Sequence, residues 1–335
     1  MRFRFNKYKK IMKWPLRVFY IIGAIALILV VWEVYIPVSL SPKETIVYSA
    51  KKGMGDDEIA IELQKLGIIK SNYFFRGYVI LTLQHSKLQA GKYTLSSSMS
   101  TAQIIKKFVS GDVIKQTVTI PEGWDLADIK KYFKENKILN EEEFTAAVKK
   151  DFSNEFSFLK DKPEDMNLEG YFFPDTYQVS EGESTEDIFK AALLNFRQKL
   201  TPDLRTEIAK QEKSVFEIIT MASIIEKEVK SLNEKKIVSG ILWKRLSVGM
   251  PLQVDATINY ITGKNDPGVA IKDTKIDSPY NTYKYKGLPK GPISNPGLDS
   301  IIAAIYPKQT KYWFYLTNGR TIFSETLLQH NAARY

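Results

Sequence analysis

The longest uninterrupted run of hydrophobic positions lies near the N-terminus, where VFYIIGAIALILVV (18–31) carries no charge. With its flanks the apolar stretch is about 20 residues long, enough for a helix to cross a hydrocarbon core of ~30 Å. Aromatic side chains stand near both of its ends, as is common where a helix meets a membrane surface: Trp14, Tyr20, Trp32 and Tyr35. The pattern predicts a single N-terminal transmembrane helix over 18–36, ended by Pro37.

The charges around this helix predict its direction. A cleaved signal peptide is the alternative to a transmembrane anchor. No small-x-small cleavage site follows Val31, which favours the uncleaved anchor. Residues 1–17 contain seven basic side chains and no acid. Because basic segments stay on the cytoplasmic side, 1–17 is predicted to be a cytoplasmic tail. Residues 38–335 are then expected outside the cytoplasm, beyond a cell (inner) membrane.

The remaining composition excludes several classes of function. The tail supplies seven of the ten net positive charges, so the rest of the chain is nearly balanced and predicts no binding of nucleic acid. Cysteine is absent, which excludes disulfides, thiol nucleophiles and cysteine-ligated zinc. The two histidines, His85 and His330, lie far apart and outside any zinc motif. No metal or cofactor is expected.

A weak internal repeat follows the helix, with an offset of 70 residues between 48–74 and 118–144. Each copy reads as a short strand, a turn with glycine, an amphipathic helix and the start of a second helix. Matching positions include Gly53 with Gly123 and Ile59 with Ile129. The repeat therefore predicts related α/β units within 45–150.

The segment between the copies, 88–111, predicts a strand, a Ser/Thr-rich turn and a helix that begins at about Thr101. Strand, helix, helix and strand in this order resemble a LysM-type carbohydrate-binding module. A plain α+β spacer without a ligand fits the same pattern, and the pattern does not choose between them.

The second half, 165–335, predicts a mixed α+β domain, so the fold class is α+β overall. The charged, proline-containing segment 151–170 reads as a linker before it. Apolar periodicity predicts three helices, at 185–200, 204–231 and 233–248. Residues 250–300 are rich in Gly, Pro, Asn and Asp and predict loops. An Asn-Gly pair predicts a hairpin over 312–323.

The helix around 216–230 carries a carboxylate within its apolar face. On a helical wheel Glu226 falls at about 80°, between Ala222 and Ile219. Burial penalises a charged carboxylate and raises its pKa, as a general acid near neutral pH requires. Glu228 at about 280° and Glu217 at about 260° also border the wide apolar arc, so the wheel nominates these carboxylates without choosing among them.

Two loop segments carry polar groups suited to sugars. Gln253 and Asp255 are two residues apart, on one side of an extended segment. The Gly- and Pro-rich loop 278–297 contains Asn281, Thr282 and Tyr283. Amides and hydroxyls hydrogen-bond sugar hydroxyls, and aromatic rings stack on sugar faces. A purely structural loop is the alternative, but a long loop in a compact domain favours a binding function.

Four segments together resemble one family: LEGYFFPDTY (168–177), ASIIEKE (222–228), RLSVGMPLQVDAT (245–257) and YNTYKYKGLPKGPISNPG (280–297). They are similar to motifs of the endolytic murein transglycosylases, or YceG-like family, and occur in the same order. The resemblance covers nearly all of the region after the membrane helix. Val229 stands where the family commonly has threonine.

The resemblance implies a lyase that acts on peptidoglycan. It makes Glu226 the catalytic acid/base and places a substrate groove along these residues: Gln253, Asp255, Asn281, Thr282 and Tyr283, with Glu169 and Tyr171 nearby. The family cuts nascent glycan strands between MurNAc and GlcNAc, leaves 1,6-anhydroMurNAc ends, and so terminates strand elongation. It needs no cofactor, and association with cell-wall synthases is expected.

Two other functions remain open on the residues alone. A hydrolytic muramidase would use a second carboxylate, such as Asp255, to activate water. A non-catalytic peptidoglycan-binding membrane anchor would bind sugars without any need for Glu226. The sequence also leaves open whether Glu228, Glu169 or Asp255 assists catalysis.

Overall fold

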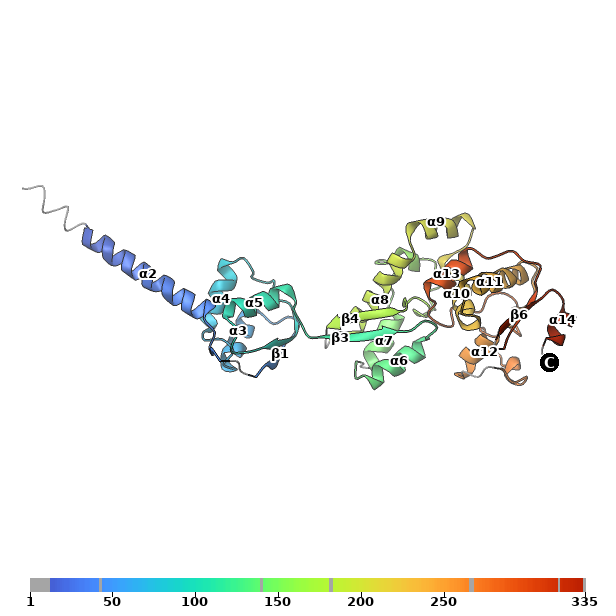
Figure 1. Ribbon diagram of the computed structural model, residues 1–335, viewed down its shortest axis with the longest axis horizontal. Helices are drawn as coiled ribbons and strands as arrows, with labels where there is room; N and C mark the ends of the chain where they lie inside the picture. Colours follow the sequence, from blue (N-terminus) through green and yellow to red (C-terminus); the bar gives the residue numbers. More distant parts are fainter. Residues whose placement is uncertain are drawn as a thin grey trace, which may run out of the picture. The chain divides into compact units, whose positions relative to one another are not determined.

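A computed structural model describes residues 13–41, 44–138, 141–180, 183–264, 268–318 and 320–333 (Figure 1). Its described residues form two compact units. The first covers those up to 116 and within 179–183, and the second covers those within 117–178 and 184–335. Helices predominate, and the strands of the described part pair into three two-stranded sheets. The predicted α+β class is confirmed.

The first unit begins with the long apolar helix α2 (Lys13–Tyr35). Its stretch from Arg17 to Tyr35 is long and apolar enough to cross a membrane, and its side chains are almost all exposed. The predicted helix is therefore present and ends one residue before the predicted boundary.

A small α/β body follows α2. Its elements are β1 (Ile46–Ala50), α3 (Asp56–Lys65), α4 (Asn72–Leu81), β2 (Gly91–Leu95) and α5 (Thr101–Ser110). Strands β1 and β2 pair antiparallel, with Tyr48 opposite Tyr93, and both rings pack around Phe108. The start of α5 at Thr101 confirms the predicted helix, because Ser100 caps it in a capping box. A LysM-like binding function stays a prediction.

The second copy of the repeat lies in the second unit. It comprises β3 (Lys115–Ile120), α6 (Leu126–Glu135) and α7 (Glu141–Lys149), and β3 pairs with β4 (Asp175–Ser180). The order of strand, helix, helix and strand is thus the same in both copies. The predicted boundaries, 45–150 and 165–335, stay predictions, and the two copies belong to different compact units.

The segment before β4 is part of the core, so the linker predicted over 151–170 is wrong. Its short helix η1 (Ser157–Leu159) and its apolar side chains are buried, among them Phe152, Phe156 and Leu168. Phe158 packs against Phe196, with ring centroids 4.9 Å apart. These aromatic residues have no regular spacing, and the charged residues between them give the segment the composition of a linker.

A group of helices forms most of the remainder of the second unit. They are α8 (Thr185–Lys199), α9 (Pro202–Lys210), α10 (Val215–Glu228), α11 (Leu232–Ser247), α12 (Asp255–Thr262) and α13 (Leu298–Ile305). The single helix predicted over 204–231 is two helices. The chain breaks where Glu212 adopts a left-handed φ of 55° and Ser214 starts α10 with a capping box.

The predicted C-terminal hairpin is confirmed. Strands β5 (Phe314–Asn318) and β6 (Arg320–Ser324) pair antiparallel, with Phe314 opposite Ser324, and α14 (Leu327–Ala332) packs on both. The glycine of the predicted turn, at position 319, lies outside the described residues. A short helix, η2 (Asp273–Lys275), interrupts the loop region before α13.

Candidate active site

Helix α10 carries both carboxylates of the EKE segment on different sides. Eight successive residues, from Ile218 to Ile225, are buried, so the helix is fixed on most of its circumference. Val229 is extended and ends the helix, which makes Glu228 its last residue. Because Glu226 and Glu228 are about 200° apart around the helix axis, they enter different surroundings.

Glu226 lies in a buried ion pair. Its side chain is 8 % exposed and that of Lys235 is 3 % exposed, and the Lys235 ammonium lies 3.2 Å from both carboxylate oxygens. The Ser300 hydroxyl and the Gly297 amide also donate to it, at 2.6 and 3.0 Å. Glu226 therefore joins α10 to α11 and to the start of α13.

A further carboxylate lies near this pair. Burial, and then the negative charge of Glu226, raise the pKa of Glu122 in the turn after β3. A side chain at Gly297 would collide with the Glu122 carboxylate, so the glycine is needed for this close approach. The Glu226 carboxylate therefore already accepts from three protein donors, on Lys235, Gly297 and Ser300.

Glu228 faces a cavity of about 530 Å³. Desolvation by burial raises its pKa to about 7, and the charge of Asp255 acts in the same direction. Hydrogen bonds from the Tyr315 hydroxyl and the Ala256 amide stabilise the carboxylate and oppose this rise. A carboxyl group with a pKa near neutral can donate and accept a proton at physiological pH.

Three of the predicted groove residues line the same cavity: Gln253, Asp255 and Tyr283. Asp255 is the first residue of α12, and the Tyr283 hydroxyl donates a hydrogen bond to it. Gln253 is exposed, with a left-handed φ of 54°, and its backbone N–H donates to the carbonyl of Thr282 at 3.1 Å. The two predicted loop segments therefore meet beside Glu228.

Arg245 on α11 also lines the cavity, although it is not among the residues predicted from the sequence. Its Nε donates to the carbonyl of Trp313 at 2.9 Å, and its Nη1 donates to that of Leu252 at 2.8 Å. The guanidinium also lies over the ring of Phe314, 5.0 Å from its centroid. Arg245 thus joins the loop before α12 to strand β5, and it brings a positive charge to the cavity.

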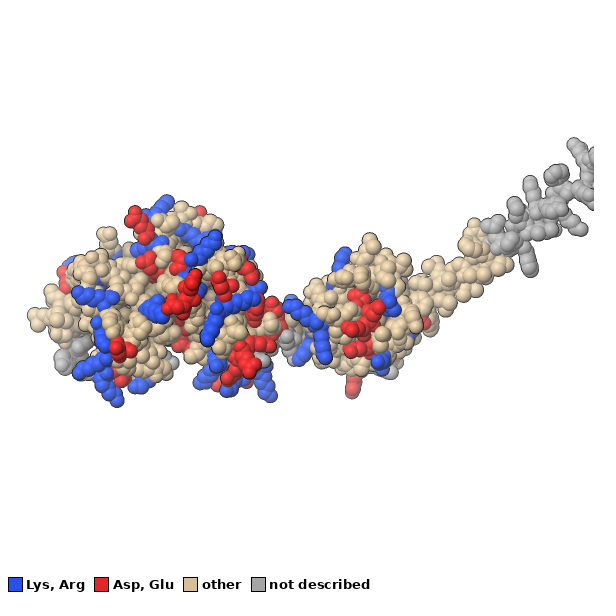
Figure 2. All heavy atoms as spheres, turned by 180° about the vertical axis from the view of Figure 1, so that it is seen from behind, with Lys and Arg blue, Asp and Glu red and all other residues tan. Residues whose placement is uncertain are grey.

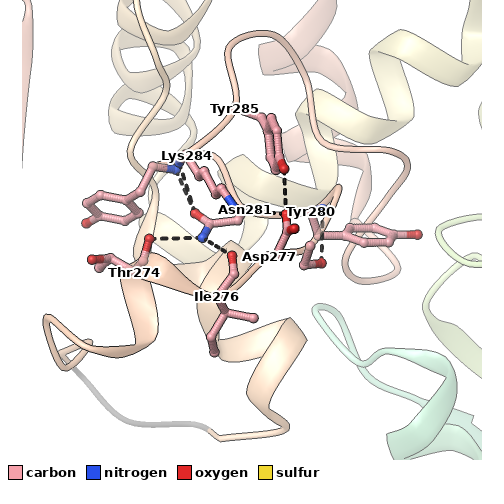
Figure 3. Close-up of polar contacts among 9 residues, drawn as sticks. Thr274, Ile276, Asp277, Tyr280, Asn281, Lys284 and Tyr285 are labelled. Atoms are coloured by element: carbon pink, nitrogen blue, oxygen red, sulfur yellow. Dashed lines mark hydrogen bonds and ion pairs between the residues drawn. The ribbon is translucent and has the colours of Figure 1, made fainter.

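Asn281 lies inside its loop, where it organises the backbone (Figure 3). It is 1 % exposed, and its amide group donates to the carbonyls of Thr274 and Ile276 at 3.0 and 2.7 Å. Its Oδ1 accepts from the amides of Tyr283 and Lys284 at 2.9 and 3.2 Å. Its bonds hold the turn that presents Tyr283 to the cavity.

Thr282 is equally buried and serves the same loop. Its hydroxyl accepts from the Val254 amide at 3.0 Å and lies 2.9 Å from the Thr257 hydroxyl. These bonds fasten the loop to the beginning of α12. Asn281 and Thr282 shape the cavity wall through the backbone.

Glu169 and Tyr171 lie in the interior of the second unit. Glu169 is 2 % exposed and accepts from the Leu126 amide at 3.0 Å and the Tyr260 hydroxyl at 3.4 Å. Burial raises the pKa of Glu169 to about 8. Tyr171 is fully buried and packs between Phe158 and Phe196.

The structure therefore brings together only part of the predicted site. Around the cavity it joins Gln253, Asp255 and Tyr283 to Glu228, and it adds Arg245 and Tyr315. The other predicted residues lie in buried polar clusters or in the core: Glu226, Asn281, Thr282, Glu169 and Tyr171. The wheel could separate Glu226 from Glu228, but only contacts distant in sequence reveal which of them borders the cavity.

The cavity has the composition of an acid/base site for a polyhydroxylated substrate. It holds a carboxyl group with a pKa near 7, beside another carboxylate, tyrosine hydroxyls and side-chain amides. Such a combination is typical of enzymes that protonate and cleave glycosidic bonds.

Comparison with known proteins agrees with this class. The model of the YceG-like family matches residues 49–335, and the chain belongs to that family. The endolytic murein transglycosylase of Bacillus subtilis (strain 168) is 36 % identical over 312 residues, which cover 89 % of this chain and 86 % of that protein. This chain is accordingly an enzyme, a lyase of the lytic transglycosylase class.

Two further relatives extend the comparison. The endolytic murein transglycosylase of Streptococcus pneumoniae serotype 2 is 30 % identical over 88 % of this chain, and the match spans 59 % of that longer protein. The crystal structure of a yceG-like protein from Listeria monocytogenes aligns with a TM-score of 0.57 at 33 % identity. That alignment covers 87 % of this chain and all of that one.

Proposed function

We propose that this protein cuts nascent peptidoglycan strands internally between MurNAc and GlcNAc, leaves 1,6-anhydroMurNAc ends, and so terminates strand elongation. The proposal assigns the acid/base role to Glu228. Its main support is the pKa of about 7 for a carboxyl group that borders the cavity. Membership of a family with murein transglycosylases supports the substrate class.

One carboxyl group is sufficient for this chemistry. Protonated Glu228 donates its proton to the glycosidic oxygen as the bond to the anomeric carbon breaks. The resulting carboxylate then takes the proton of the MurNAc C6 hydroxyl while O6 bonds to the anomeric carbon. The proton is returned to Glu228, no water is consumed, and the product is the anhydro sugar.

The assignment departs from the expectation for Glu226. Both oxygens of Glu226 face the Lys235 ammonium, and one also accepts from Ser300 and Gly297. A carboxylate held in this way would have to break a buried ion pair before it reached a sugar, which is costly. We assign Glu226 a positioning role, in which it holds the end of α10 against α11 and α13.

The other cavity residues would bind and polarise the strand. Gln253 and Asn259 offer amides, and Tyr283 offers an aromatic face beside its hydroxyl. The carboxylate of Asp255 can stabilise positive charge that develops on the sugar ring in the transition state. Because Asp255 acts electrostatically on Glu228, a muramidase that uses Asp255 to activate water is the second candidate.

We further propose that α2 anchors the chain in the cell membrane, with 1–17 in the cytoplasm and residues 38–335 outside it. The apolar span and the basic residues before it support this orientation. An active site tethered near the membrane would meet strands as they are made, which fits an association with cell-wall synthases.

Mass spectrometry of purified peptidoglycan strands tests the chemistry and the assignment together. We expect wild type to release internal fragments with anhydro ends and Glu228→Gln to release none. Glu143→Gln, an exposed position on α7, is the matched control and should retain full activity. Reducing ends would instead indicate the muramidase, and an active Glu228→Gln variant would refute the assignment of Glu228.

A further inference from the structure

Helix α4 has apolar side chains on two faces. Its inner face, with Phe75 and Val79, is fully buried in the first unit. Its outer face carries Tyr73, Ile80 and Leu81, which are 77, 59 and 82 % exposed. These three positions follow the i, i+7, i+8 spacing of one helical face. A helix on the surface of a water-soluble body normally turns polar residues outward. This outer face is apolar instead, which is typical of a surface that contacts a partner or a membrane.

The apolar surface continues beyond the helix to Leu83. This residue is 78 % exposed and adopts a left-handed φ of 58°. A leucine seldom adopts this conformation, and here it gains no burial within the protein in return. The one charged residue of α4, Arg76, pairs with Asp57 on α3.

The end of α2 lies directly beside α4 (Figure 1). Tyr35 packs edge-on against Tyr78, with ring centroids 6.1 Å apart. Lys70, just before α4, donates to the carbonyl of Trp32 at 2.8 Å and lies over its ring at 4.5 Å.

Two more observations show that α2 is packed against the small α/β body. Val34 is 1 % exposed, and the Thr101 hydroxyl at the start of α5 donates to the carbonyl of Glu33 at 3.2 Å. The membrane helix and the small α/β body are therefore one packed unit, and the body begins where the apolar span ends. Figure 2 shows that span almost free of charged side chains.

We propose that Tyr73, Ile80, Leu81 and Leu83 rest in the outer surface of the bilayer that α2 crosses, at the boundary between headgroups and acyl chains. The inference depends on the proposed anchoring by α2. Lipid is favoured as the occupant because α4 packs against the end of the apolar span that would cross the bilayer. Leucine and isoleucine enter that boundary through their apolar area, and a tyrosine favours it because its ring is apolar and its hydroxyl is polar.

Such a contact would fix the orientation of the first unit on the membrane. A single transmembrane helix alone leaves rotation and tilt free, whereas a second apolar contact beside it restricts both. The first unit would then hold a constant face towards the membrane and present its other faces to the cell wall.

The chain has no cysteine, so single cysteines can report on this contact without other changes. We would place a fluorescent label at Leu81→Cys in the full chain, reconstituted in phosphatidylethanolamine and phosphatidylglycerol vesicles with nitroxide-bearing lipids. The matched control is Ser110→Cys, which is exposed at the far end of α5 from its contact with α2. Ile25→Cys, on the exposed surface of α2, reports on anchoring itself.

We expect the label at Leu81 to be quenched several-fold more strongly than the label at Ser110, with the label at Ile25 also quenched. Quenching at Ile25 with equal, weak quenching at Leu81 and Ser110 would overturn the inference and leave the anchor intact. A label at Ile25 that lipids do not quench would refute the anchor and this contact together. Energy transfer between Leu81 labels, without lipid quenching, would overturn the proposal in favour of a second copy of the chain.

Discussion

Glu226 and Glu228 lie two residues apart at the end of α10, yet one closes a buried ion pair and the other borders a cavity. This difference in surroundings follows from helix geometry, because side chains two residues apart point in directions about 200° apart around the helix axis. Lys235 and Ser300 occupy the side of Glu226, whereas Asp255 and Tyr315 occupy the side of Glu228. On the proposed assignment, the same short segment holds the end of α10 against its neighbours through Glu226 and supplies the acid through Glu228.

The two glutamates should differ in their effect on stability. Glu226→Gln leaves the Lys235 ammonium buried without its partner and should lower the free energy of unfolding by about 3 kcal/mol. Glu228→Gln removes a carboxyl group that the fold already disfavours in its charged form, so stability above pH 7 should be unchanged or higher. Urea denaturation of both variants, monitored by tryptophan fluorescence, measures the difference.

A second change at Lys235 provides the control for this comparison. Lys235→Met in the Glu226→Gln background removes the unpaired charge and should restore part of the lost stability. Equal destabilisation by Glu226→Gln and Glu228→Gln would contradict the separation of their roles.

The dependence of cleavage on pH should follow Glu228. The acid must be protonated to act, so kcat/KM should fall as pH rises through about 7. The Tyr315 hydroxyl stabilises the carboxylate, so Tyr315→Phe should raise the pKa of Glu228 and move this fall to higher pH. The charge of Asp255 raises that pKa, so Asp255→Asn should move the fall to lower pH.

Opposite shifts from two neighbours of one group are difficult to obtain by general loss of structure. Tyr312→Phe is the matched control, because Tyr312 stacks on Phe323 with ring centroids 5.5 Å apart. We expect it to leave the pH profile in place. A profile that stays unchanged in both Tyr315→Phe and Asp255→Asn would show that Glu228 is not the group that titrates.

The buried Glu169 predicts a pH dependence of stability. Its pKa rises from an ordinary value of 4.5 in the unfolded chain to about 8 in the fold, because burial desolvates the charge. Between these values the folded state binds the proton and the unfolded state does not. Stability should therefore fall as pH rises through this window, by up to about 1.4 kcal/mol per pH unit.

Comparison of Glu169→Gln with wild type isolates this contribution, since glutamine does not titrate. The midpoint of thermal unfolding should fall less steeply between pH 5 and 8 in the variant. The comparison is made in a Glu228→Gln background, so that Glu228→Gln replaces wild type as the reference. This removes the contribution of Glu228, whose raised pKa gives a slope of the same sign. Parallel curves for the two proteins would contradict the raised pKa of Glu169.

Local pattern was enough to predict much of the fold. The apolar span of α2, the Ser100 cap of α5 and the alternation around the C-terminal hairpin are all short-range signals. The division between α9 and α10 was missed, because the apolar periodicity continues across a break that depends on the backbone at Glu212.

The site was predicted only in part, for a different reason. Polar loop composition is enough to nominate Gln253, Asp255 and Tyr283, which line the candidate cavity. Asn281 has the same composition but points into its own loop, and only the loop's backbone determines that direction. Arg245 and Tyr315 reach the cavity from elements distant in sequence, and periodicity alone carries no signal for such contacts.

The turn at Gly170, which packs against α10, should tolerate substitution poorly. It has a left-handed φ of 85°, and a methyl group there would lie 2.5 Å from Pro292 Cβ and 3.0 Å from Ile219 Cγ2. Gly249 has a similar φ of 67° but open space around it, so it isolates the backbone effect. We expect Gly249→Ala to lower the free energy of unfolding by about 1 kcal/mol, and Gly170→Ala to lower it by about 2–4 kcal/mol through the added collision. Because Ile219 belongs to α10, Gly170→Ala should also reduce strand cleavage, which Gly249→Ala should leave near wild type. Equal losses of stability in chemical denaturation would show that the collision relaxes and that Gly170 is needed for its backbone conformation alone.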